Sequence, residues 1–75
     1  MHQHQRLMRR RGATTYTDEE RMQLLALLKG APGVENVEIS GVNPKGGYRT
    51  TFDLSTDSID SFLALLDAND WMSVF

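Results

Sequence analysis

The stretch VENVEISGVNPKGGYRTTFDL, residues 34–54, decides the fold of this 75-residue chain. Apolar and polar residues alternate in both of its halves, as they do in strands with one buried face. Between the halves, the segment from Asn43 to Gly47 contains a proline that fixes φ and glycines that allow positive φ, a composition typical of a turn. The stretch therefore predicts an antiparallel hairpin with strands near 34–40 and 48–54.

The second strand of this hairpin predicts which side chains enter the core. The alternation places its aromatic and leucine side chains on one face and the polar ones on the other. We expect Tyr48, Thr50, Phe52 and Leu54 to face the core, with Arg49, Thr51 and Asp53 facing outward. Because no aromatic residue lies on the outward face, the pattern does not favour the base stacking of RNA-recognition sheets.

Helical patterns flank the hairpin on both sides. Before it, Thr17 is a capping residue and Glu20 follows three positions later, the spacing of a capping box. After it, apolar residues recur at helical spacing from Ile59 to Leu66. We expect three further elements: helices over about 18–29 and 57–68, and a short strand over 71–75.

The predicted elements match a known order once a first strand is added. Ala13-Thr-Thr-Tyr16 has the β-branched and aromatic character of a strand. With it, the order becomes βαββαβ, which is ferredoxin-like. We therefore predict a small two-layer α+β sandwich, an antiparallel sheet with two helices on one face. Since this strand would lie inside the sheet but is only weakly apolar, two alternatives stay open: a three-stranded sheet, or a sheet completed by a second copy.

The passage Ala31-Pro-Gly-Val-Glu-Asn-Val-Glu-Ile39, with the later Tyr48–Asp53 strand, resembles the helix-to-strand passage of heavy-metal-associated and ACT-type domains. The resemblance covers about residues 20–75 and rests on pattern. The metal-binding cysteines of the first family are absent, so its function does not carry over. The lack of cysteine also excludes disulfides and thiolate chemistry. It fits a cytoplasmic location, as does the lack of an apolar run long enough to span a membrane.

Charge is divided unevenly along the chain. Residues 1–16 contain four arginines and no acid, whereas residues 17–75 contain four bases and all ten acids. Since residues 1–12 show no apolar period, we interpret them as a flexible basic arm and residues 13–75 as a single domain. Clustered guanidinium groups can neutralise phosphates, which makes four residues a candidate nucleic-acid site: Arg6, Arg9, Arg10 and Arg11. The alternatives are a solvated tail and an acidic protein surface, including the domain's own acidic end.

The C-terminal third offers a candidate protein-binding surface. Residues 50–75 contain five acids and no base, so the second helix has an acidic face, which either binds a basic partner or is simply its solvated side. The large aromatic residues that follow either close the core or form an apolar edge for a partner. The candidate protein-binding residues are Asp57, Asp60, Asp67, Asp70, Trp71 and Phe75.

Catalytic constellations are not evident in the sequence. It offers no nucleophile–base arrangement, and its carboxylates cluster on a helix face that we expect to be exposed. His2 and His4 alone are too few to form a metal site. We expect no enzyme activity, cofactor, metal, small-molecule substrate or membrane partner. The first hypothesis is a non-enzymatic protein-interaction module, either monomeric or homodimeric. The alternative is a nucleic-acid-binding accessory protein that uses the arginine arm, and a third is an acidic modulator that competes with nucleic acid for a basic protein.

Overall fold

The hairpin predicted from residues 34–54 is confirmed by a computed structural model, which describes residues 2–74 of the chain. Strands β2 (Val34–Val42) and β3 (Tyr48–Leu54) pair antiparallel. All four residues expected on the core face of β3 are buried. The other elements are β1 (His2–Arg10), α1 (Asp18–Lys29), a 3₁₀ turn η1 (Thr56–Ser58), α2 (Ile59–Ala68) and β4 (Trp71–Val74).

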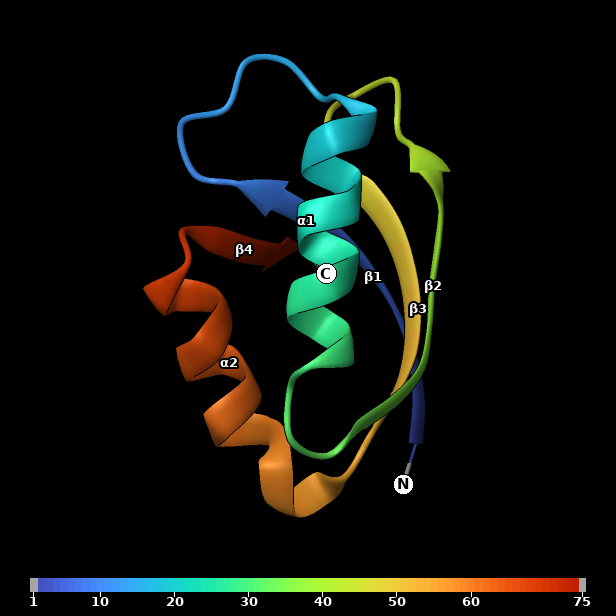
Figure 1. Ribbon diagram of the computed structural model, residues 1–75, viewed down its shortest axis with the longest axis vertical. Helices are drawn as coiled ribbons and strands as arrows, with labels where there is room; N and C mark the ends of the chain where they lie inside the picture. Colours follow the sequence, from blue (N-terminus) through green and yellow to red (C-terminus); the bar gives the residue numbers. More distant parts are fainter. Residues whose placement is uncertain (1, 75) are drawn as a thin grey trace.

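The four strands form one antiparallel sheet in the order β2-β3-β1-β4, and the chain follows the predicted βαββαβ order (Figure 1). Strand β1 lies inside the sheet. It pairs with β3 from His2 to Met8 and with β4 from Leu7 to Arg10. Among residues 2–74, one edge of the sheet is therefore β2, and the other is β4 followed by the first half of β1.

Both helices pack on the same face of the sheet. The ring of Phe62 in α2 lies 5.1 Å from the ring of Phe52 in β3. Tyr48, which shares that face of β3, donates a hydrogen bond to Glu20 of α1 at 2.9 Å. Among the described residues, the other face of the sheet carries no helix. The core is thus a single layer of side chains between sheet and helices.

The predicted helix α1 begins as expected, with one difference at its cap. The side chain of Thr17 accepts a hydrogen bond from the amide of Glu20 at 3.2 Å. In a capping box, the Glu20 carboxylate would return a bond to the Thr17 amide. Here the Thr17 amide donates to the hydroxyl of Tyr48 instead, at 3.0 Å, and Glu20 accepts from Tyr48 and Arg10. The first turn of α1 is therefore tied to the sheet rather than to itself.

The first strand lies elsewhere than predicted. It runs over His2–Arg10, while Ala13–Tyr16 belongs to the connection that leads to α1. The prediction of a flexible arm over residues 1–12 is therefore wrong for His2–Arg10, and so is the three-stranded alternative. The first strand was misplaced because Met8 is the only fully buried apolar residue of β1, so the strand has no apolar stripe in the sequence. Backbone pairing on β3, rather than an apolar stripe, holds β1 in place.

The C-terminal elements agree with the prediction apart from their boundaries. The helix expected from residue 57 begins with η1 and becomes α-helical at Ile59. Strand β4 covers Trp71–Val74, and Phe75 lies outside the described residues. No helix within residues 2–74 is long and apolar enough to cross a membrane.

Candidate functional site

The first half of β1 has a strand on only one side. Strand β4 accompanies β1 from Leu7 to Arg10 and then ends, while β3 continues to pair with β1 as far as His2. Within residues 2–74, His2–Arg6 therefore has no strand neighbour on the β4 side; we call this stretch the open edge. Backbone N–H and C=O groups along such an edge are a template for a further strand.

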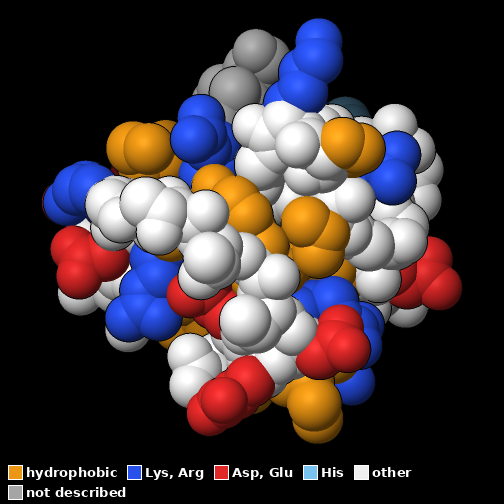
Figure 2. All heavy atoms as spheres, turned by 90° about the horizontal axis from the view of Figure 1, so that it is seen from above, with side chains coloured by type: hydrophobic (Ala, Val, Ile, Leu, Met, Phe, Trp, Pro, Cys, Tyr) orange, Lys and Arg blue, Asp and Glu red, His pale blue; other side chains and the backbone are white. Residues whose placement is uncertain are grey.

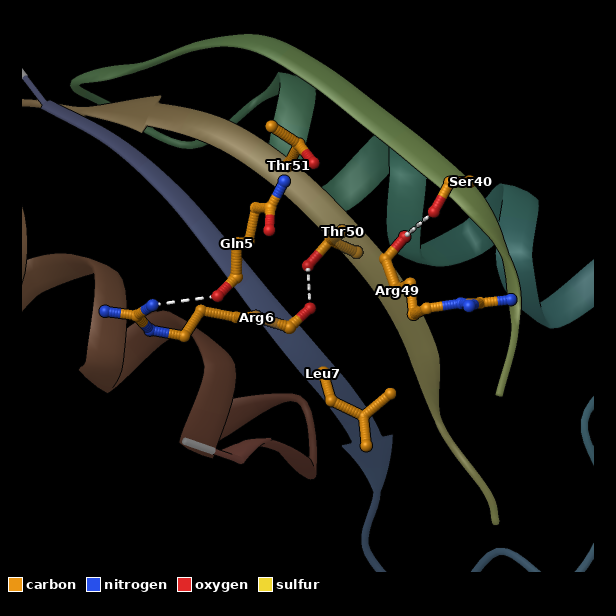
Figure 3. A pocket seen from close by; sticks show the side chains of 7 residues that line it. All are labelled: Gln5, Arg6, Leu7, Ser40, Arg49, Thr50 and Thr51. Atoms are coloured by element: carbon orange, nitrogen blue, oxygen red, sulfur yellow. Dashed lines mark hydrogen bonds between the residues drawn. The ribbon is translucent and has the colours of Figure 1, made fainter. Parts of the chain in front are cut away.

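Hydrogen bonds on β1 show which backbone groups point out of the open edge. Thr50 of β3 donates from its hydroxyl to the carbonyl of Arg6 at 2.8 Å, so this carbonyl faces β3. The Arg6 guanidinium donates to the carbonyl of Gln5 at 2.8 Å on the opposite side of β1 (Figure 3). Backbone groups alternate in direction along a strand. Gln3 and Gln5 therefore point their backbone groups out of the open edge, and His4 points its groups toward β3.

An apolar groove of about 160 Å³ runs beside the open edge, between β1 and α2. Its floor consists of core side chains, and its wall on α2 consists of Ile59 and Leu63, which are 38% and 44% exposed. Within the described part of the chain, no strand follows β4 along β1 to cover these two residues. The complete lining is His4, Arg6, Phe52, Leu54, Ile59, Phe62, Leu63 and Ser73.

Two polar side chains of β1 reach into this groove. The His4 ring stacks on Phe52 with 5.7 Å between ring centroids. A guanidinium nitrogen of Arg6 lies 3.3 Å from Nδ1 of His4, in addition to its bond to the Gln5 carbonyl. The Arg6 side chain thus covers a backbone acceptor of the open edge, and an incoming strand has to displace it.

The opposite edge of the sheet, β2, is built differently. Its pairing with β3 shifts between Glu35 and Glu38 and again between Ile39 and Gly41. Asn36 has φ of 54° and Gly41 has φ of 140°, so the backbone departs from a regular strand at both places. Bulges and exposed charges discourage the addition of a further strand. The open edge of β1 has an unbroken register and no acid, so it is the more receptive of the two edges.

Two of the four candidate arginines are engaged by the domain's own acids. Arg10 lies 3.4 Å from a carboxylate oxygen of Glu20, and Arg11 lies 2.7 Å from Asp67 and 3.5 Å from Asp70. The hydrogen bond and the charge of Asp67 raise the pKa of Arg11. The expected alternative of a contact between the basic segment and the acidic end agrees with the two pairs of Arg11, whereas Arg10 pairs with an acid of α1. These ion pairs join the end of β1 to α1 and to the end of α2.

The other candidate arginines are separated by the strand itself. Arg6 faces the helices and lines the groove, whereas Arg9 is exposed and bonds the hydroxyl of Tyr16 at 3.4 Å. Arg9 shares the helix-free face of the sheet with Arg49, which borders a shallow hollow of about 270 Å³ (Figure 3). At the end of the molecule seen in Figure 2, basic and acidic side chains are interspersed. The structure does not gather the four arginines into one surface.

The predicted protein-binding residues are also divided. Four of them, Asp57, Asp60, Asp67 and Asp70, are exposed. Trp71 is buried, with its ring 5.8 Å from that of Tyr48, so its side chain belongs to the core. Phe75 lies outside the described residues.

Tyr48 has the most strongly perturbed titration that the structure shows. It is fully buried, donates to Glu20 and accepts from the amide of Thr17. Burial, reinforced by the hydrogen bond to Glu20, raises the pKa of Tyr48 to about 12. This group fastens α1 to the sheet and lies away from the groove, so it is part of the scaffold.

The groove was not predicted from the sequence, because the pattern around each of its residues is typical of a helix core face or of a polar segment. Ile59 and Leu63 belong to the apolar repeat of a helix, and His4 lies in a polar segment without period. The sequence contains only a weak indication of strand β1. Residues 2–10 include no acid and no turn-forming residue, and Met8 is followed by arginines. Only the length of β4 shows that two residues of the helix repeat stay exposed.

Comparison of the chain with protein-family models, with curated proteins and with solved structures finds no match. Within the part of the chain that the structure describes, no three His, Cys, Asp or Glu side chains come together as a metal site. We therefore interpret the open edge and its groove from their own chemistry.

Proposed function

We propose that this chain is a non-enzymatic protein-interaction module that binds an extended segment along the open edge. The supporting observation is that, within residues 2–74, β4 accompanies only Leu7–Arg10 of β1, while an apolar groove lies directly beside the preceding residues of the strand. Extended segments add to such edges through backbone hydrogen bonds, and their alternate side chains fill neighbouring pockets. Both requirements are present in one place.

The chemistry of the groove favours binding over catalysis. Side chains at alternate positions of an added strand would point toward the helices and lie against Ile59 and Leu63. Apolar groups there would leave water at about 25 cal/mol for each Å² buried. The polar lining is limited to His4, Arg6 and Ser73, and the first two bond each other.

The fold that carries this edge is, we propose, ferredoxin-like. The βαββαβ order and the sheet order β2-β3-β1-β4 support this assignment. In this arrangement β1 lies between β3 and β4, and the described part of β4 accompanies only Leu7–Arg10 of β1.

Site-specific photo-crosslinking tests the proposal. In one variant, a benzophenone amino acid replaces Leu63 in the groove, where the side chain is 44% exposed. In the matched control it replaces Met72, which is 40% exposed. Met72 lies on the helix-free face, because it is opposite Arg9 in the sheet register. We expect protein adducts from position 63, in cells that make this protein, and few from position 72. Equal yields at the two positions, or none at 63, would overturn the proposal.

A second candidate function, nucleic-acid binding, is favoured by the helix-free face of the sheet. Arg9 and Arg49 are both exposed there, whereas Arg10 and Arg11 are paired with acids. The test is fluorescence anisotropy of labelled oligonucleotides at two salt concentrations. If nucleic acid is the ligand, affinity falls with salt and falls further in Arg9→Gln/Arg49→Gln than in Arg10→Gln/Arg11→Gln. Absence of binding at low salt would remove this candidate.

A further inference from the structure

We infer that a hollow at one end of the molecule binds a phosphate monoester whose organic part is apolar or aromatic. The hollow lies between the connection from β1 to α1 and the turn from β2 to β3, which are both at the top of Figure 1. We call it the basic hollow. It shares no residue with the groove beside the open edge, so it is a separate site.

The charges around the basic hollow have one sign. Arg9 of β1 and Lys45 of the turn both line it, and none of its described lining residues is an acid. Among residues 2–74, neither of these two cations forms an ion pair, whereas Arg10 and Arg11 do. A hollow lined by charges of one sign concentrates ligands of the opposite sign. The ligand is therefore an anion.

The acidic first turn of α1 follows the connection but leaves the basic hollow positively charged. Asp18 lies 3.4 Å from Arg21, and Glu20 lies 3.4 Å from Arg10, so both carboxylates are paired within the domain. Glu19 is exposed and is not part of the lining. The two cations of the hollow thus keep their charge available for a ligand.

Contacts with two residues hold Arg9 in position. Its Nε donates to the hydroxyl of Tyr16 at 3.4 Å. Its aliphatic stem lies against Gly47, where an added Cβ would come within 2.9 Å of Arg9 Cγ. Within residues 2–74, the two terminal nitrogens of this guanidinium have no hydrogen-bond partner. Such a pair of nitrogens can bind a phosphate through two parallel hydrogen bonds.

The turn that carries Lys45 is fixed by its own hydrogen bonds. The side-chain oxygen of Asn43 accepts from the amide of Lys45 at 2.8 Å, and the Asn43 carbonyl accepts from Gly46 at 2.8 Å. Gly46 has φ of 99°, and an added Cβ would lie 3.0 Å from the Tyr16 hydroxyl. Glycine here lets the turn approach the connection closely, which brings Lys45 to the same hollow as Arg9.

The remaining lining indicates what the phosphate is attached to. Thr14 and Thr15 are exposed and supply hydroxyl groups that can donate to phosphate oxygens. Val42 and Pro44, both exposed, add apolar surface on the side of the turn. The volume of the basic hollow is about 690 Å³, within the range of about 300–1,000 Å³ for small-molecule sites. This room and the apolar border favour a phosphate monoester with an apolar or aromatic body.

Amide NMR titration of the full chain with phenyl phosphate tests the site, with sodium chloride at matched ionic strength as the reference. We expect saturable shifts within residues 13–16 and 43–47, with a dissociation constant of roughly 1 mM, because solvent weakens exposed charge pairs. Inorganic phosphate should bind at the same place about fivefold more weakly, since it buries no apolar surface. Shifts confined to other residues, shifts that chloride reproduces, or equal affinity for the two phosphates would overturn the inference.

Three variants that each remove one positive charge provide the second test. Arg9→Gln and Lys45→Gln should each weaken binding of phenyl phosphate about tenfold, because each removes a charged donor. Arg49→Gln is the matched control, since Arg49 shares the helix-free face with Arg9 but does not line the basic hollow. All three side chains are exposed, so we expect the variants to fold.

The control should bind phenyl phosphate with the affinity of the wild-type chain. A loss in Arg49→Gln equal to that in the other two variants would indicate general charge attraction and would overturn the assignment to this hollow. Arg49 is one of the two arginines on which the nucleic-acid candidate depends, so that candidate and the phosphate site fail separately. Photo-crosslinking at position 63 does not involve the basic hollow and tests the open edge independently.

Discussion

The two halves of β1 differ in what surrounds them. Leu7–Arg10 lies between two strands, with Met8 completely buried. His2–Arg6 has the same partner on one side, but its other side borders the groove. One continuous strand is thus part of the core at one end and, in the proposed function, a binding edge at the other. Within residues 2–74, the difference lies in how far β4 accompanies β1.

The largest expected effect lies in the doubly paired half. Met8→Ala removes a fully buried side chain, and we expect the free energy of unfolding to fall by about 3–4 kcal/mol. The neighbouring Leu7→Ala acts on the helix-free face, where the side chain is only half-buried, and should cost about 1 kcal/mol or less. Urea unfolding followed by the fluorescence of Trp71 measures both. Similar losses in the two variants would mean that the core is not confined to the helix side.

Proline substitutions within His2–Arg6 should cause the next largest loss in the free energy of unfolding. The size of that loss should depend on the direction of the N–H that proline removes. His4 directs its N–H toward β3, so His4→Pro breaks a ladder bond and should cost about 2–3 kcal/mol. Gln5 directs its N–H out of the open edge, where proline is tolerated, so Gln5→Pro should cost less than about 1 kcal/mol. The same urea titrations measure this pair. A larger loss for Gln5→Pro than for His4→Pro would show that the backbone directions are reversed.

These two halves also show how far the sequence could be interpreted. The hairpin and α1 follow from strong local patterns, such as the alternation around Phe52 and the cap at Thr17. Strand β1 has no such pattern, because ring stacking of His4 and backbone bonds to β3 replace an apolar stripe. The open edge depends on how far β4 extends along β1, which is a relation between distant segments. A single sequence does not encode that relation locally, so the groove could not be predicted.

A third effect, of intermediate size, comes from Tyr48, which pairs with Met8 in the doubly paired half. Its pKa is raised in the folded state, from an ordinary value of 10 to about 12, because burial disfavours the charged form. The associated stability is complete below pH 10 and is lost as the pH rises toward 12. We expect the wild-type chain to lose about 1–2 kcal/mol more than Tyr48→Phe over this range. If the unfolding free energies of the two proteins change with pH in parallel, ionisation of Tyr48 does not contribute to the pH dependence of stability.

The smallest effect should come from the ion pairs just beyond β1. Arg11 and Asp67 are both exposed, so solvent screens their attraction, and Arg11→Gln should leave the urea midpoint almost unchanged. Glu20, the partner of Arg10, is only 16% exposed and also accepts the Tyr48 hydroxyl. Arg10→Gln should therefore lower the midpoint more than Arg11→Gln, and added salt should narrow the difference. If Arg11→Gln proves the more damaging, the pairing with Asp67 and Asp70 helps to hold the end of β1 against β4. In that case surface charge, as well as the length of β4, would set the boundary between the two halves of the strand.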